Sequence, residues 1–204
     1  MRECLIVFTR YPEPGKTKTR LIPCLGSEGA ANLQRQMTEH TLRQVKEVQV
    51  SREISVAVYF AGGNAQQMQE WLGKTFIYQP QHEGDLGDRL KSAFETAFDN
   101  GMNRVVIIGI DCPSLTTPIM EQAFLALAQQ DLVLGSAEDG GYYLIGLRQL
   151  IPELFNGINW GTSEVLQQTV KVAKEMDLAI AYLPTLPDID RPEDLWIWEQ
   201  INRQ

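Results

Sequence analysis

Asp111 is the residue of this sequence that is best placed to do chemistry. It follows the apolar, β-branched run Val105–Ile110 and precedes Cys112 and Pro113. Such a run between turn signals predicts a buried strand, and Pro113 ends it because proline cannot donate to a sheet ladder. The carboxylate would therefore lie where a core strand leaves the sheet, which is where open α/β sheets bind ligands. The position suits a metal ligand and, equally, an aspartate that caps its own turn.

Two aspartates near the end of the sequence would complete such a metal site. Asp188 and Asp190 lie on the same side of the chain if that segment is extended. Together with Asp111 they would present hard oxygen ligands, which select Mg²⁺ or Mn²⁺ over zinc, and phosphate oxygens would complete the coordination. The alternative is that Asp190 caps the last predicted helix, in which Pro192 stands near the first turn.

A basic loop, residues 10–20, follows the first predicted strand. Cations and exposed backbone N–H groups bind phosphates, so this loop predicts a phosphate or nucleotide site. The run Gly15–Thr17 is not the end of a Walker A loop, because Arg10 stands where that motif needs a glycine. A solvated basic loop is the alternative. The residues expected to bind phosphate are Arg10, Gly15, Lys16, Lys18 and Arg20.

A second candidate for nucleotide contact is the segment that contains Gly84, Asp85 and Gly87. It lies between a predicted strand and a predicted helix, and its two glycines would let a bound base or sugar approach the backbone closely. Asp85 also suits the N-cap of the helix that follows, which is the commoner role for such a residue. The three residues are therefore predicted to bind a nucleotide, with helix capping as the alternative for Asp85.

The expected substrate side of the site follows Asp139. Gly140 and Gly141 come next and would let a substrate lie against the main chain, although Asp-Gly-Gly is also a turn signal between two strands. Tyr142 begins the next predicted strand, on which it and the following tyrosine point to opposite faces. Trp160, in a glycine-flanked loop, is a further candidate for substrate contact.

Alternating elements must position these residues. The expected strands are 4–9, 54–60, 75–78, 105–110, 132–136, 142–147 and 179–183. The expected helices are 27–50, with Ser27 as its N-cap, 64–72, 86–100, 162–176 and 192–201, with another opened by Thr117 and Pro118. Strands that alternate with helices indicate one α/β domain over residues 1–204, with three layers, α/β/α, around a doubly wound, mostly parallel sheet.

Composition and charge narrow the class of protein. A net charge of −8 argues against nucleic acid as a partner of the whole surface. Three cysteines without C-x-x-C spacing argue against a disulfide framework or a zinc site and fit a reducing cytosol. The chain opens directly into a strand pattern, without a signal peptide, and no apolar stretch reaches the roughly 20 residues that span a bilayer. We expect a cytoplasmic protein without a membrane span.

Taken in order, these segments resemble the nucleotide-diphospho-sugar transferase superfamily, which has the Rossmann-like type-A glycosyltransferase fold. The more specific resemblance is to a small bacterial family of glycosyltransferases, some of them linked to arsenosugar biosynthesis. Molybdenum-cofactor and phospholactate nucleotidylyltransferases share similar motifs. The motifs that carry the resemblance are Pro12–Gly15 with Lys18–Leu21, Gly84–Leu90, Asp111–Pro113, Asp139–Tyr142 with Leu144–Leu147, and Asp188–Asp190.

The resemblance implies a role for the charged residues. Asp111 and Asp190 would bind the metal ion, Mg²⁺ or Mn²⁺. Lys18 and Arg20 would face the phosphates and take part in catalysis. Asp139 would be an acid on the acceptor side and a possible base in an inverting transfer.

Three functions are consistent with the sequence. The leading hypothesis is a divalent-metal-dependent glycosyltransferase with a nucleotide-diphospho-sugar donor and a small-molecule acceptor. The second is a nucleotidylyltransferase that transfers NMP from an NTP to a small phosphorylated acceptor. This chain lacks the L-A-A-G-x-G-x-R loop of many sugar nucleotidylyltransferases, and prolines with a single Gly15 stand in its place. The third is a catalytically silent nucleotide-binding module whose acids are caps and turns. The sugar, base, acceptor and oligomeric state stay open.

Overall fold

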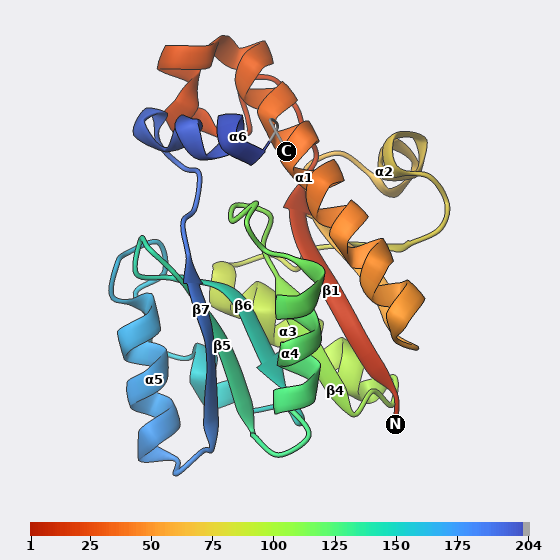
Figure 1. The fold of residues 1–204 in the computed structure, drawn as a ribbon, viewed down its shortest axis with the longest axis vertical. Coiled ribbons are helices and arrows are strands. Elements are labelled where there is room, and N and C mark those ends of the chain that lie inside the picture. The colour runs from red at the N-terminus through yellow and green to blue at the C-terminus, as the bar shows by residue number, and fades with distance from the viewer. Residues whose placement is uncertain (202–204) are drawn as a thin grey trace.

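One sheet of seven strands runs through the computed structural model, which describes residues 1–201 (Figure 1). The strands are β1 (Glu3–Arg10), β2 (Ser55–Ala61), β3 (Ile77–Pro80), β4 (Arg104–Ile108), β5 (Leu132–Ala137), β6 (Tyr142–Leu147) and β7 (Ile180–Leu186). Their order is β3-β2-β1-β4-β6-β5-β7. Among these described strands, β6 alone runs antiparallel to its neighbours, which confirms the mostly parallel sheet.

Helices cover both faces of the sheet and complete the three predicted layers (Figure 1). They are α1 (Ile22–Ser51), α2 (Ala65–Leu72), α3 (Leu86–Asp99), α4 (Thr117–Ala126), α5 (Val165–Glu175) and α6 (Leu195–Ile201). Successive side chains of a strand point to opposite faces. Leu5 and Val7 of β1 accordingly pack with α1, α4 and α6, while Ile6 and Phe8 pack with α3 and α5.

The structure corrects several predicted boundaries. The helix predicted from Ser27 begins at Ile22, and it is kinked where Gly26 has a φ of 70°, so the Ser27 cap is wrong. The strand predicted to reach Ile110 ends at Ile108. Apolar periodicity shows that a segment is buried, but it does not show where the neighbouring strand stops pairing with it. Asn64, by contrast, caps α2 as its position suggests, because its side chain accepts a hydrogen bond from the Gln67 backbone.

The winding of the sheet reverses between β1 and β4. The chain passes from β1 to β2 and β3 on one side, then returns through α3 to place β4 on the other side of β1. Because β1 and β4 are parallel, their carboxyl ends lie at the same edge of the sheet, and the loops that follow them diverge there. In open α/β sheets this reversal is the usual place of a ligand pocket. None of the described helices is both long and apolar enough to cross a membrane.

Candidate functional site

A pocket of about 360 Å³ opens at the carboxyl edge of the sheet, at this reversal between β1 and β4. Its walls include Thr9 and Arg10 at the end of β1 and Gly109–Asp111 just after β4. Segments that are far apart in the sequence therefore meet here. The predicted site residues that line the pocket are Arg10, Lys18, Asp111, Tyr142 and Asp190.

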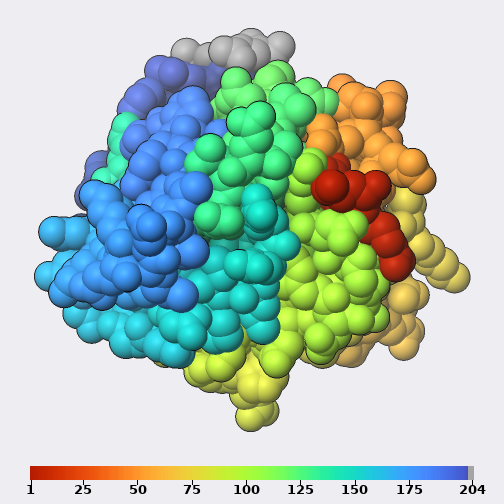
Figure 2. Space-filling view, turned by 90° about the horizontal axis from the view of Figure 1, so that it is seen from below, coloured from red at the N-terminus to blue at the C-terminus, as the bar shows by residue number. Residues whose placement is uncertain are grey.

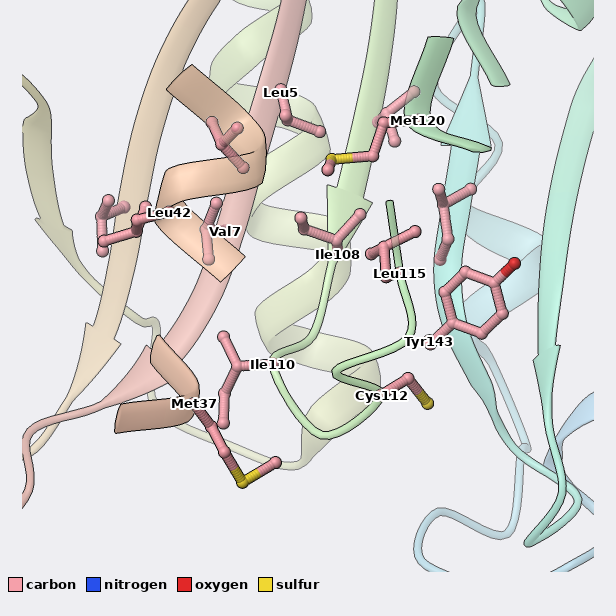
Figure 3. Packing of buried hydrophobic residues seen from close by; sticks show 14 of the residues in the cluster. Leu5, Val7, Met37, Leu42, Ile108, Ile110, Cys112, Leu115, Met120 and Tyr143 are labelled. Carbon is pink, nitrogen blue, oxygen red and sulfur yellow. The ribbon is translucent and has the colours of Figure 1, made fainter. Parts of the chain in front are cut away.

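Burial of the two neighbouring residues determines the direction of the Asp111 side chain. Ile110 and Cys112 are 4% and 3% exposed, and Figure 3 shows both side chains inserted into the apolar core, one beside Met37 and the other beside Tyr143. The intervening Asp111 therefore projects outward, with 57% of its side chain exposed. Within residues 1–201 its carboxylate accepts a hydrogen bond from Lys18 and none from the backbone of its own turn. The turn-capping alternative for Asp111 is thus not realised.

Lys18 joins three segments at one wall of the pocket. Its backbone has a φ of 46° and a ψ of 43°, a left-handed conformation that is uncommon for residues other than glycine, and its side chain is 4% exposed. The ammonium donates to Asp111 Oδ1 at 2.6 Å and to the backbone carbonyl of Ile189. The Ile189 backbone N–H in turn donates to the Asp111 carbonyl at 2.8 Å. An ammonium has three N–H donors, so one of them is left for a ligand.

Arg20 pairs with Asp190, which lines the same pocket. The guanidinium donates to Asp190 Oδ2, and its side chain is 62% exposed. Asp190 does not cap the last helix. Arg191 is the N-cap of the turn that leads into α6, and the Asp194 carboxylate accepts from the backbone N–H groups of Arg191 at 2.7 Å and Asp190 at 3.0 Å. Arg20 is thus ion-paired with Asp190, and its contact with phosphates stays a prediction.

The remaining cations of the basic loop divide into two groups. Arg10 is exposed and lines the pocket. Lys16 is 66% exposed and pairs with Glu13 at 2.7 Å, outside the pocket lining. Gly15 has a φ of 80° and open space beside it, so glycine serves the turn there rather than a close packing contact. Phosphate binding by Lys16 and Gly15 stays a prediction.

Asp188, which the sequence grouped with Asp111 and Asp190, does not line the pocket but lies among the same carboxylates. Burial and, after it, repulsion by the carboxylates of Asp139, Asp194 and Asp111 together raise its pKa to about 6. The same electrostatic surroundings act on Cys112, since burial first and then Asp111, Asp188 and Asp139 raise the pKa of its thiol. Cys112 therefore stays protonated and is a packing residue. The i, i+2 spacing of Asp188 and Asp190 was the sequence signal for this acid.

The carboxylates would supply at most two ligands to a divalent cation, whose other ligands would have to come from water or substrate. Among residues 1–201, no three His, Cys, Asp or Glu side chains lie close enough together to hold a metal ion by themselves. Mg²⁺ usually takes one or two protein carboxylates and fills its remaining positions with water and substrate phosphates. The mutual repulsion of Asp111, Asp139 and Asp188 is of the kind that a bound cation relieves.

Helix capping and packing explain the residues of the segment around Gly84. Asp85 caps α3, because its carboxylate accepts from the Asp88 backbone at 3.0 Å while the Asp88 carboxylate accepts from the Asp85 backbone at 3.2 Å. Gly84 has a φ of 108°, and a Cβ there would lie 2.3 Å from Asp88 Oδ2. Gly87 packs against the indole of Trp160, whose Nε1 would be 2.5 Å from an added Cβ. None of the three predicted residues lines the pocket, so their contact with a nucleotide stays a prediction.

Asp139 serves the turn between β5 and β6 and also faces the acids. Its Oδ1 accepts from the Gly141 backbone at 2.8 Å. Gly140 has a φ of 90° and lies against Ser163, whose carbonyl oxygen would be 2.2 Å from an added Cβ. The turn role is therefore realised, yet the carboxylate still raises the pKa of Asp188. One carboxylate oxygen of Asp139 remains outside the turn.

The aromatic candidates form part of the wall. The rings of Tyr142 and Trp160 pack edge to face with their centroids 6.3 Å apart. The Tyr142 hydroxyl is buried beside that of Thr169, and burial raises its pKa. The Tyr143 hydroxyl donates to the Pro184 carbonyl at 2.9 Å. Tyr142 therefore lines the pocket with atoms other than its hydroxyl, and substrate contact by Trp160 stays a prediction.

Comparison with known proteins places the chain in a family. The model of a family described as "Uncharacterized protein conserved in bacteria (DUF2064)" matches residues 41–162, more than half of the chain. The chain belongs to this family. A crystal structure from Desulfovibrio desulfuricans G20, assigned as a nucleotide-diphospho-sugar transferase, is 35% identical with a TM-score of 0.92 and is matched over 100% of this chain and 89% of that one. The resemblance inferred from the sequence motifs is thus confirmed. No curated protein sequence matches this chain.

More distant solved structures share the fold. The 4-diphosphocytidyl-2C-methyl-D-erythritol synthase of Anaerococcus prevotii DSM 20548 is 11% identical with a TM-score of 0.66, and covers 100% of this chain and 96% of its own. A CMP:2-keto-3-deoxy-manno-octonic acid synthetase, in complex with CTP, is 10% identical with a TM-score of 0.62, over 100% of this chain and 99% of that one. At such identities the likeness confirms the predicted fold and carries no assignment of function.

Proposed function

We propose that this chain is a divalent-metal-dependent glycosyltransferase that uses a nucleotide-diphospho-sugar donor. The observation that carries the proposal is the cation-lined pocket at the reversal of the sheet, with Lys18 paired to Asp111 at 2.6 Å. Support comes from the relative assigned as a nucleotide-diphospho-sugar transferase, which is 35% identical over the whole of this chain. Fold likeness alone would not distinguish the transferases that share this architecture.

The charges of the pocket suit a diphosphate. The free N–H of Lys18 would donate to a phosphate oxygen, and Arg10 would add a second positive charge from the end of β1. Arg20 would reach the phosphates by exchanging its contact with Asp190. Because Lys18 is nearly fully buried, its interaction with an anion is screened less than that of a surface lysine.

The carboxylates would hold the metal ion. Asp111 is the exposed member of the group. Asp190, which also lines the pocket, would join it when Arg20 exchanges its contact for a phosphate, and Asp188 would add a further carboxylate nearby. When bound, Mg²⁺ or Mn²⁺ supplies Lewis-acid stabilisation of the negative charge on a leaving diphosphate. Asp139 would orient the acceptor hydroxyl with the carboxylate oxygen that the Gly141 backbone does not engage.

An assay of nucleoside diphosphate release from a panel of nucleotide-sugars, with and without Mn²⁺, tests the proposal. We expect Mn²⁺-dependent release that falls about 100-fold or more in Asp111→Ala, the size of effect seen when one transition-state charge contact is removed. Asp99→Ala, at an exposed acid at the end of α3, is the matched control and should retain full activity.

The same panel separates the alternatives. Pyrophosphate release from an NTP and a phosphorylated acceptor, without any reaction of nucleotide-sugars, would replace the proposal with nucleotidyl transfer. Undiminished activity of Asp111→Ala would remove Asp111 from the metal site. Calorimetric titration that shows nucleotide binding, without reaction of any donor, would leave the silent nucleotide-binding module.

A further inference from the structure

Two glutamines of the pocket are held so that each presents only its carbonyl oxygen. Gln34 comes from α1 and Gln81 follows β3, and both line the pocket together with the end of β1. Neither belongs to the ion pairs described above. The side-chain amide of a glutamine can present either a donor or an acceptor, so the partners of its nitrogen decide which one a ligand meets.

Gln34 is locked by a directed chain of hydrogen bonds. The Thr38 hydroxyl donates to the Gln34 backbone carbonyl at 2.9 Å, so the hydroxyl of Thr9, 2.8 Å from that of Thr38, must donate to it. Thr9 Oγ1 is then an acceptor, and Gln34 Nε2 donates to it and to the Arg10 carbonyl, both at 3.2 Å. Both N–H groups of the amide are used. Turning the amide over would place its oxygen against the Arg10 carbonyl.

The oxygen of Gln34 has no such partner. Gln34 is 5% exposed, and within residues 1–201 no group donates to its Oε1. The described side-chain atoms that are sealed from solvent without a partner are Tyr142 Oη and Thr169 Oγ1. Because Gln34 Oε1 is not one of these, it is reachable from outside, and the pocket is the space that Gln34 lines. Acceptors on buried side chains are normally hydrogen-bonded, so the unpaired Oε1 of Gln34 indicates that a ligand supplies the missing donor.

Gln81 is held in the same way as Gln34, with its amide nitrogen bonded to the ends of two strands. Its Nε2 donates to the carbonyls of Thr9 in β1 and Tyr59 in β2, each at 3.1 Å. Its backbone N–H donates to the Phe60 carbonyl at 2.9 Å, which holds the residue against β2. Both amide partners are carbonyls, so this amide cannot turn over either. No described residue donates to its Oε1.

We propose, on the basis of the proposed nucleotide site, that Gln34 and Gln81 select a nucleobase with an exocyclic amino group. An amino group would satisfy an open acceptor, whereas the keto oxygen that replaces it in uracil or hypoxanthine would meet a like acceptor and leave both unsatisfied. The apolar side chains of Phe8, Leu86 and Leu90 line the same pocket and suit the face of a planar base better than a sugar.

Calorimetric titration of the intact chain with two matched pairs of nucleotides tests this selection. CDP and UDP differ at the amino or keto group of the pyrimidine, as ADP and IDP do in the purine. In whichever pair binds, we expect the amino base to bind about tenfold tighter or more, since 1.4 kcal/mol is a factor of ten. Equal binding within that pair, or a preference for UDP or IDP, would overturn the selection and leave the proposed function standing. Absence of binding by all four, and by GDP and dTDP as well, would overturn both.

Variants assign the selection to the two amides. Gln81→Met and Gln34→Met remove one acceptor each, and we expect the ratio of affinities within the binding pair to fall toward one. The ratio is taken on one protein sample, so a partial loss of folded protein does not mimic the effect. Gln69→Met, at an exposed glutamine of α2 outside the pocket, should keep the wild-type ratio. An unchanged ratio in both pocket variants would show that other groups read the base.

Discussion

The amino edge and the carboxyl edge of the sheet both hold buried charged side chains, but their partners differ. At the amino edge Glu3 is 7% exposed and accepts hydrogen bonds from Arg52 at 2.9 Å and Arg104 at 3.0 Å. Burial alone would raise the pKa of Glu3, but the two arginines outweigh it and lower the pKa. Figure 2 views the molecule from this side, where the start of the chain (red) lies beside the segment that leads into β4 (yellow-green).

At the carboxyl edge, by comparison, the charged side chains are not all paired with buried groups of opposite charge. Lys18 is as buried as Glu3, yet its partner Asp111 is 57% exposed. Nearby, Asp188 is surrounded by other carboxylates, which together with burial keep its pKa raised. Removing one partner from a buried charge network leaves an uncompensated charge inside the fold, whereas a set of charges that repel one another and reach solvent is typical of a ligand site. The comparison therefore assigns the Glu3 network to stability and the charges around Lys18 and Asp188 to ligand binding.

The largest expected effect lies at the amino edge. Glu3→Met leaves two partly buried arginines without a carboxylate and should lower the free energy of unfolding by about 3–5 kcal/mol. Urea denaturation measures the change, with Glu28→Met at an exposed position of α1 as the control. Nucleotide affinity of the folded protein should stay unchanged. A loss below about 1 kcal/mol would show that the triad is not the completed network described above.

Gly87→Ala would test whether one glycine of the carboxyl edge belongs to packing rather than to the site. Its Cβ would meet the Trp160 indole, so we expect the free energy of unfolding to fall by about 1–3 kcal/mol, as in other overpacked cores. Urea denaturation and nucleotide titration of the same samples measure the two effects. Stability that holds while nucleotide affinity falls would instead return Gly87 to the predicted nucleotide contact.

Lys18→Met sharpens the comparison most directly. The Asp111 carboxylate that loses its partner is exposed enough to be hydrated, but the Ile189 carbonyl also loses its donor. The free energy of unfolding should therefore fall by about 1–2 kcal/mol, less than for Glu3→Met. Affinity for a nucleoside diphosphate should fall about tenfold or more, because a charge-assisted hydrogen bond to phosphate is lost. Lys74→Met, at an exposed lysine outside the pocket lining, is the control. Unfolding as large as that of Glu3→Met would make Lys18 a structural residue.

The smallest expected effect concerns pH. The folded-state pKa of Asp188 is raised from 3.8 to about 6, so its contribution to stability is present below pH 4 and is lost as the pH rises through 6. Asp188→Asn removes the ionisation and should raise Tm at pH 8 by about 2–4 °C, the shift that about 1 kcal/mol produces at this size, with no gain at pH 4. Thermal scans at several pH values measure it against Asp99→Asn. Parallel pH profiles for wild type and Asp188→Asn would contradict the repulsion.

Much of the fold could be predicted because its signals are local. The bounds of β6 coincide with the predicted 142–147, where an apolar run is delimited by a turn on each side. Local sequence signals gave a wrong helix start where the surrounding structure determines the boundary. Ser27 has the chemistry of an N-cap, but the helix begins earlier and passes through the kink at Gly26. The antiparallel direction of β6 follows from its turn with β5, which the Asp-Gly-Gly sequence indicated.

The candidate site was predictable in its members more than in their partners. Lys18, Asp111 and Asp190 do line one pocket, as their places after strands suggested. Gln34 was not identified, because a glutamine inside a helix carries no sequence signal of its own. Its importance depends on the Thr9 and Thr38 hydroxyls that fix its amide, and these are set by the packing of α1 against β1.

By itself the sequence determined the alternation of strands and helices, the family, and the edge at which charged residues collect, since these follow from periodicity, motifs and strand ends. Only the tertiary structure decided which charges meet. Lys18 and Asp111 are 93 positions apart, and Arg20 and Asp190 are 170 apart. Contacts over such separations depend on how the sheet orders its strands and on which side chains the core buries. The same packing pairs the Glu3 carboxylate with two arginines at one edge, and at the other edge it surrounds Asp188 with other carboxylates.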